Sequence, residues 1–70
     1  MGNNMTFGQR LEYTMANRKR RKRELANSLG YDASSMTKWC RDESEPRLSA
    51  IQGLCKELKC SADWLVFGKR

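Results

Sequence analysis

Residues 22–41 read KRELANSLGYDASSMTKWCR, and this stretch predicts two short helices joined by a tight turn. Its apolar residues recur at helical spacing on both sides of Gly30, so they can hold the two helices to each other and to the rest of the domain. These apolar residues are Leu25, Leu29, Tyr31, Met36 and Trp39. The pattern is that of a helix-turn-helix, and the alternative is an ordinary helical hairpin in a small bundle.

Three residues around the turn have a physical reason for their position. Ala26 supplies the small side chain that two steeply crossing helices need where they touch. Gly30 can adopt the left-handed backbone conformation without a Cβ penalty. Asp32 stands where a side-chain oxygen can accept a hydrogen bond from the free N–H groups of the second helix. These residues therefore favour the same break and restart of the helix as the apolar spacing.

The second helix of the pair has an outward face of small or polar residues, with two cations and no acid. Its members are Ala33, Ser34, Thr37, Lys38 and Arg41. A helix in the major groove of DNA needs short side chains near its N-terminal end and donors that reach base edges or phosphates. This face fits that requirement. It also fits an ordinary solvated helix surface, and the adjacent turn favours the DNA interpretation.

The composition narrows the class of protein. Seventy residues make one domain, residues 1–70, and the formal charge of +6 favours an anionic partner such as nucleic acid. Histidine is absent and no cysteine lies beside an evident base, so we predict neither an enzyme nor a cofactor, metal or small-molecule site. Cys40, Cys55 and Cys60 lack the spacing of a disulfide framework or a zinc site. We expect reduced thiols, no membrane contact and the cytoplasm of a bacterial host.

A run of six cations, RKRRKR at residues 18–23, leads into the first helix of the pair. Such a run is often a solvated tract, and a nuclear-localisation signal is an alternative. Cations at a helix N-terminus oppose the helix dipole, which is understandable if a DNA phosphate lies against that end. We therefore predict a set of phosphate contacts in and beyond the run. They are Arg20, Arg21, Lys22, Arg23, Ser35, Arg41 and Arg47.

Two further helices complete the predicted core. Thr6 and Gln9 form a possible capping box at the start of a helix that ends near Asn17, after a frayed segment at residues 1–5. Its inward residues are Phe7, Leu11, Thr14, Met15 and Ala16. Residues 42–46 form an acidic loop, which should point away from DNA or toward the basic run. An amphipathic helix follows this loop. Its apolar stripe is Leu48, Ile51, Leu54, Cys55 and Leu58.

The last predicted helix, residues 62–67, is capped by Ser61 and closed by Gly68. It carries four consecutive apolar residues, which cannot all face one core. We expect Leu65 and Trp64 to be mostly internal. We predict a two-fold dimer contact made by Val66 and Phe67, with Trp64 counted in the same interface. The alternative is that these residues complete the core of a monomer.

Four segments carry a family resemblance: FGQRL at 7–11, ELANSLGYDASSMTKW at 24–39, EPRLSAIQGLCKEL at 45–58 and CSADWLVFG at 60–68. With these segments the chain resembles the xenobiotic-response-element type helix-turn-helix family, most closely the lambdoid phage repressor and Cro group. The resemblance implies an all-α, compact five-helix domain in which the third helix reads the major groove. It also implies dimers that bind palindromic operators.

The resemblance assigns roles to particular positions. The base-reading positions of the family fall on Ala33, Ser34, Thr37 and Lys38, of which Lys38 is the best candidate for reading guanine. Lys22 stands where the family commonly has glutamine, so a phosphate contact is expected there. Because the other side chains are short, DNA shape should supply much of the specificity.

A buried ion pair of the family is replaced on both sides. Many members pair an arginine of the first helix with a glutamate after the tryptophan position of the third, and this chain has Met15 and Cys40 at these places. Replacing both partners by apolar groups can be neutral or stabilising. We therefore expect Met15 and Cys40 to touch in the core.

Together these features predict a sequence-specific regulator of transcription that binds double-stranded DNA. We expect a repressor of phage or prophage origin that binds its operator as a dimer and blocks polymerase. One alternative is an antitoxin-type protein that also binds a protein partner, although the chain has little room for a partner-binding extension. Another is a non-specific or single-stranded nucleic-acid binder, which would need exposed aromatic residues among the cations.

Overall fold

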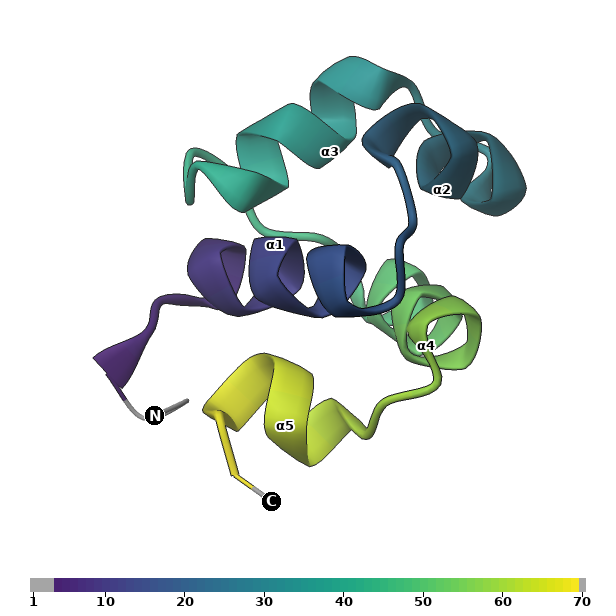
Figure 1. The fold of residues 1–70 in the computed structure, drawn as a ribbon. Helices are drawn as coiled ribbons and strands as arrows, with labels where there is room; N and C mark the ends of the chain where they lie inside the picture. The colour runs from purple at the N-terminus through teal and green to yellow at the C-terminus, as the bar shows by residue number, and fades with distance from the viewer. Residues whose placement is uncertain (1–3, 70) are drawn as a thin grey trace.

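The computed structural model describes residues 4–69, and within them it consists of five α-helices (Figure 1). The helices are α1 (Phe7–Asn17), α2 (Lys22–Leu29), α3 (Ala33–Cys40), α4 (Leu48–Leu58) and α5 (Ala62–Phe67). The predicted five-helix, all-α fold is confirmed. Residues 1–3 of the segment predicted to be frayed lie outside the described residues. Met5, at its end, is held because its carbonyl oxygen accepts a hydrogen bond from the Arg10 guanidinium.

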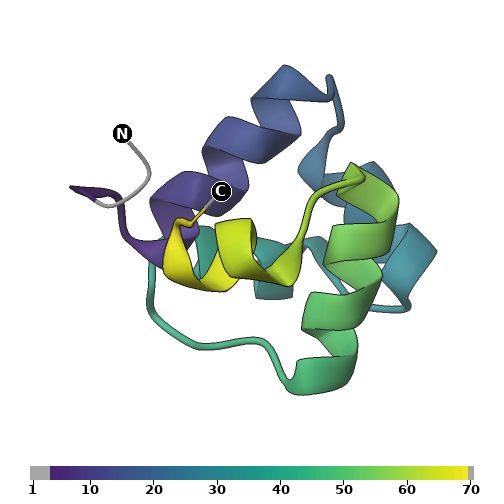
Figure 2. The ribbon, with the colours of Figure 1, turned by 90° about the horizontal axis from the view of Figure 1, so that it is seen from below.

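The first helix, α1, lies at the centre of the fold. Figure 1 shows α2 and α3 on one side of it and α5 on the other. α1 packs against both α3 and α5, while α4 joins α2 to α5. Figure 2 shows that the connection from α3 to α4 is an extended loop without a helix of its own. None of the helices in residues 4–69 is long and apolar enough to cross a membrane.

The core takes side chains from all five helices. Its buried apolar residues are Leu11, Met15, Leu25, Ala26, Met36, Trp39, Cys40, Ala50, Leu54, Leu58 and Leu65. Tyr31, in the turn between α2 and α3, packs edge-on against Trp39 with their ring centroids 5.0 Å apart. Met15 and Cys40 both belong to this core, as expected, and their direct contact stays a prediction.

The caps of the helices follow the sequence with one exception. Gly30 ends α2 with a left-handed φ of 79°. Thr6 and Gln9 form the predicted capping box, and the Ser61 hydroxyl accepts a hydrogen bond at the start of α5. Asp32 stands at the N-cap position of α3, but its side chain accepts no capping hydrogen bond. The prediction for Asp32 was therefore correct in position and wrong in interaction.

Two residues assigned to inward faces are exposed. Ala16 is one residue beyond Met15, and a helix turns by about 100° per residue, so its side chain lies outside the inward stripe of α1. Leu48 is 71% exposed. The buried residues of α4 are Ala50, Leu54 and Leu58, four residues apart, and Leu48 lies almost opposite Ala50 on the helix.

Asp42 connects the acidic loop to the first helix. Its carboxylate accepts hydrogen bonds from the Thr6 hydroxyl at 2.6 Å and from the Gly8 N–H at 2.9 Å. It therefore ties the loop after α3 to the N-terminus of α1, where the helix dipole favours a negative charge. Asp42 thus faces the start of α1 and not the basic run, and the orientation of the acidic loop relative to DNA stays a prediction.

Gly8 lets the backbones of α1 and α3 approach closely. A Cβ atom at this position would lie 2.2 Å from the carbonyl oxygen of Cys40 and 2.7 Å from that of Trp39. Both atoms belong to the backbone at the end of α3, so they cannot move aside as a side chain can. The contact between α1 and α3 therefore requires glycine at this position.

We predict that Gly8→Ala lowers the free energy of unfolding by about 1–3 kcal/mol, because the added methyl group forces α1 away from α3. The matched control is Gly53→Ala, whose Cβ would meet only the flexible Leu29 side chain and would gain helix propensity. Urea unfolding of both variants measures the difference. Equal stability of Gly8→Ala and the wild type would contradict the close backbone contact.

Candidate nucleic-acid interface

The four predicted base-reading residues lie together on the side of α3 that faces away from the core. Ser34 and Lys38 are exposed, and Ala33 and Thr37 are half-buried. The Thr37 hydroxyl donates a hydrogen bond to the Ala33 carbonyl at 3.2 Å, so its oxygen remains able to accept one. This geometry leaves Lys38 as the long donor in the middle of a surface otherwise made of short side chains.

α3 is held rigidly behind this surface. Met36 and Trp39 are buried on its inner side, and Leu25 of α2 is buried in the same core. Because α3 packs against both α1 and α2, its outward face cannot rotate without opening the core. The orientation of the four residues is thus set by buried contacts.

Three predicted phosphate-contacting residues lie at separate places around α3. Ser35 is half-buried in its first turn. Arg41 follows the last residue of the helix and lies 3.8 Å from Glu43, and this exposed ion pair has little effect on stability. Arg47 is exposed at the N-cap position of α4, where its side chain makes no capping hydrogen bond.

The basic run divides into two groups with different surroundings. Arg18 donates to the carbonyl oxygens of Leu58 at 2.9 Å and Lys59 at 3.1 Å. Arg20 donates to the Glu57 carbonyl oxygen at 3.1 Å and to its carboxylate at 2.9 Å. Both guanidinium groups are therefore bound to the C-terminal end of α4. The sequence contained no local signal for this, because the partners lie about forty residues away along the chain.

The last three cations of the run, Arg21, Lys22 and Arg23, lie at the start of α2. Arg21 is its N-cap residue and makes no side-chain capping hydrogen bond. Arg21 and Arg23 are exposed, and Lys22 lies 3.7 Å from Glu12 in a solvent-accessible pair. The first N–H groups of α2 thus have no side-chain cap in the described residues, and three cations stand beside them.

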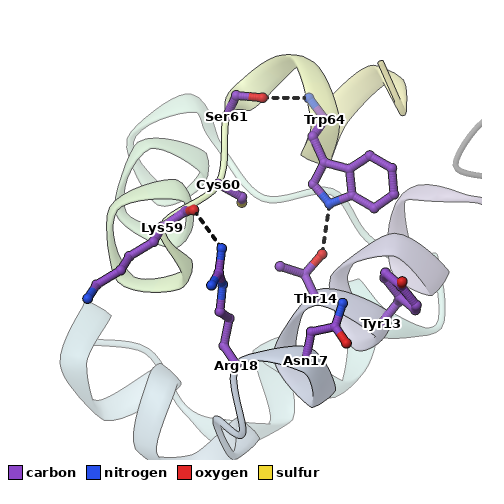
Figure 3. A pocket seen from close by; sticks show the side chains of 8 residues that line it. All are labelled: Tyr13, Thr14, Asn17, Arg18, Lys59, Cys60, Ser61 and Trp64. Atoms are coloured by element: carbon purple, nitrogen blue, oxygen red, sulfur yellow. Dashed lines mark hydrogen bonds between the residues drawn. The ribbon is translucent and has the colours of Figure 1, made fainter. Parts of the chain in front are cut away.

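An open hollow of about 500 Å³ lies between α1 and the α4–α5 connection (Figure 3). It is lined by Tyr13, Thr14, Asn17, Arg18, Lys59, Cys60, Ser61 and Trp64. The indole N–H of Trp64 donates to the Thr14 hydroxyl at 2.9 Å, and Arg18 is bound to the Lys59 carbonyl. These polar groups hold elements of the fold together.

The three cysteine thiols have raised pKa values. Burial raises the pKa of Cys40 to about 11, and burial together with the adjacent Cys55 thiol raises that of Cys60 to about 11. Burial also raises the pKa of Cys55. All three cysteines are free. In the part of the chain that the structure describes, no three His, Cys, Asp or Glu side chains are arranged to hold a metal ion.

Residues 10–63 match the model of the Cro/C1-type helix-turn-helix DNA-binding domain. The chain is also similar to the HTH-type transcriptional regulator DicA of Escherichia coli (strain K12), with 38% identity over 65 residues. The match covers 93% of this chain and 48% of DicA, so the chain spans about half the length of this relative.

Two solved structures have the same fold. The crystal structure of the P22 c2 repressor protein in complex with synthetic operator 9T has a TM-score of 0.87 and 29% identity, covering 94% of this chain and all of that one. The solution structure of the DNA-binding domain of the P22 c2 repressor has a TM-score of 0.86 and 30% identity. The match covers 94% of this chain and 87% of that one. These relatives are described as regulators and DNA-binding proteins, in agreement with the prediction that the chain is not an enzyme.

We predict slow reaction of Cys40 and Cys60 with a disulfide reagent at pH 8 in the native state. A thiol whose pKa is about 11 is ionised there in only about one molecule in a thousand, and the thiolate is the reactive form. In denaturant, three thiols should react at once, and the native rate should rise as the pH approaches 11. Rapid native labelling of Cys40 or Cys60 would contradict their raised pKa, and fewer than three thiols after unfolding would contradict free cysteines.

Proposed function

Since the chain belongs to the Cro/C1-type helix-turn-helix DNA-binding family, we propose that it is a sequence-specific regulator of transcription that binds double-stranded DNA through α3. The observation that carries this proposal is the outward face of α3, which is solvent-accessible, free of acids and held in place by the buried inner side of the helix. The likeness to the P22 c2 repressor in complex with an operator supports the same conclusion.

The side chains of α3 suggest how the groove would be read. Ala33 and Ser34 are short enough to let the first turn approach the bases, and Ala33 can pack against a thymine methyl group. Lys38 is long and exposed, and it can donate to the O6 and N7 acceptors of guanine. Few other long donors are present, so we infer that DNA shape contributes to specificity.

The phosphate contacts would come from cations on either side of α3. We propose Arg21, Lys22 and Arg23 at the uncapped start of α2 as one group, because phosphates bind readily at helix N-termini. The others are Ser35, Arg41 and Arg47. Arg20 is left out of this set, because its guanidinium is already bound to Glu57.

We further propose a homodimer formed around the end of α5. Phe67 is 64% exposed at the end of α5, and the adjacent Val66 lines a hollow of about 290 Å³ together with Phe7, Pro46 and Ile51. Exposed apolar side chains around a hollow favour burial against a second copy. Trp64 lines the other hollow, so the proposed contact is based on Val66 and Phe67.

By this proposal, a dimer would place two copies of α3 in successive major grooves and block polymerase. The resemblance to lambdoid phage repressors supports a phage or prophage origin. Such a repressor would act in the bacterial cytoplasm, where its DNA lies.

We predict that selection from a random duplex library at near-physiological salt enriches an inverted repeat with half-sites about one helical turn apart. Lys38→Ala should weaken binding to the selected site by about 1–3 kcal/mol relative to scrambled DNA. Lys56→Ala, which removes an exposed cation from α4, is the matched control and should keep the discrimination. No enrichment, with binding that collapses as salt rises, would refute the sequence-specific function.

We predict that Phe67→Ser weakens binding to the full inverted repeat by about tenfold and leaves binding to one half-site unchanged. Tyr13→Ser is the control, because Tyr13 is an exposed aromatic residue at the other hollow. Gel-shift titrations on both DNAs measure the difference. An equal effect of the two substitutions would argue against a dimer at the end of α5.

A further inference from the structure

We propose that Arg20 and Glu57 are positioning residues for DNA binding, which hold the start of α2 where it meets the DNA backbone. This inference rests on the proposed function and adds two residues that would not themselves touch DNA. It also changes the role of Arg20 from the phosphate contact that the sequence predicted.

The two residues are joined by a double contact. One nitrogen of the Arg20 guanidinium donates to the Glu57 carboxylate at 2.9 Å, and another donates to the Glu57 carbonyl oxygen at 3.1 Å. Their side chains are only 27% and 32% exposed, so water competes less with these bonds than at the surface. A planar guanidinium with two such bonds has a defined orientation.

The C-terminus of α4 is a suitable anchor for arginine. Its last carbonyl groups have no partner within the helix, and the helix dipole makes this end negative. Arg18 binds the carbonyl oxygens of Leu58 and Lys59, and Arg20 binds that of Glu57. Two arginines thus donate hydrogen bonds to the carbonyl oxygens of three consecutive residues. They attach the connection between α1 and α2 to α4 at two points.

The attachment lies directly before the helix that would meet DNA. The Arg20 N–H donates to the Met15 carbonyl oxygen at 2.9 Å, so its backbone is bound to α1 while its side chain is bound to α4. Lys19, between the two arginines, takes a left-handed φ of 54°. Arg21, the next residue, is the N-cap of α2. The path of the chain into α2 is therefore restrained up to one residue from its first turn.

Changing the charge at Glu57 distinguishes two roles for Arg20, a phosphate contact and a positioning residue for α2. Glu57 neutralises Arg20, so the net attraction for phosphates would come from Arg21, Lys22 and Arg23. If Arg20 bound a phosphate, removing Glu57 would free it and tighten DNA binding. If the pair positions α2, removing Glu57 weakens operator binding although the protein becomes more positive.

Two variants test this difference, Glu57→Gln and Arg20→Lys. Neither substitution lowers the net charge of the protein. Lysine can still contact a phosphate, but it cannot reproduce the two hydrogen bonds that the planar guanidinium makes with Glu57. We expect each to lower affinity for the selected inverted repeat by about tenfold, with little change on scrambled DNA. The control is Glu12→Gln, which makes the same charge change in the accessible pair with Lys22 and should not weaken binding.

Affinities are measured by titration well below the melting temperature of every variant, with circular dichroism to confirm folding. Arg21→Gln should lower the slope of log affinity against log salt by about 0.9, as expected for one lost phosphate contact. Operator binding at the wild-type level or tighter by Glu57→Gln and Arg20→Lys would overturn the positioning role. A wild-type protein that does not discriminate between the operator and scrambled DNA would instead refute the proposed function.

Discussion

The close contact between α1 and the end of α3 is the constraint on which the rest of the structure depends. At Gly8 the two backbones approach so closely that no Cβ atom fits between them. The same region is held by Asp42, which joins the loop after α3 to the first turn of α1. Because α1 is the central helix, this contact sets the position of α3 relative to the whole core.

Arginine has several roles in this basic protein. Arg10 is buried and donates to the carbonyl oxygens of Leu65 and Val66, which ties α1 to α5. Arg18 and Arg20 bind carbonyl oxygens at the end of α4 in a similar way. Backbone carbonyl groups at helix ends need donors, and a long side chain with five N–H groups can reach them from another element. A positive net charge therefore overstates the number of cations that are free to meet DNA.

α3 has buried apolar residues on one side and solvent-accessible polar residues on the other, which is the arrangement that the proposed DNA-reading helix needs. The inner residues of α3 are buried, while its outer residues are half-buried or exposed and, apart from Lys38, short. If α3 reads DNA as proposed, substitutions on this outer face change DNA preference with little effect on the fold. Only a few kcal/mol of net stability are available to a chain of this length, which makes the buried inner side indispensable.

The sequence alone determined the five helices, the glycine turn, the capping box and the outward face of α3. These features depend on neighbours within one or two helical turns, so periodicity and capping residues are enough to find them. Only the tertiary structure decided that Leu48 is exposed, that Asp42 caps α1, and that Arg20 binds Glu57. The last two contacts join residues 34 and 37 positions apart, and no local pattern encodes such a pairing. The packing of α1 against α3 and of α2 against α4 brings these groups together, because it decides which donors and acceptors meet.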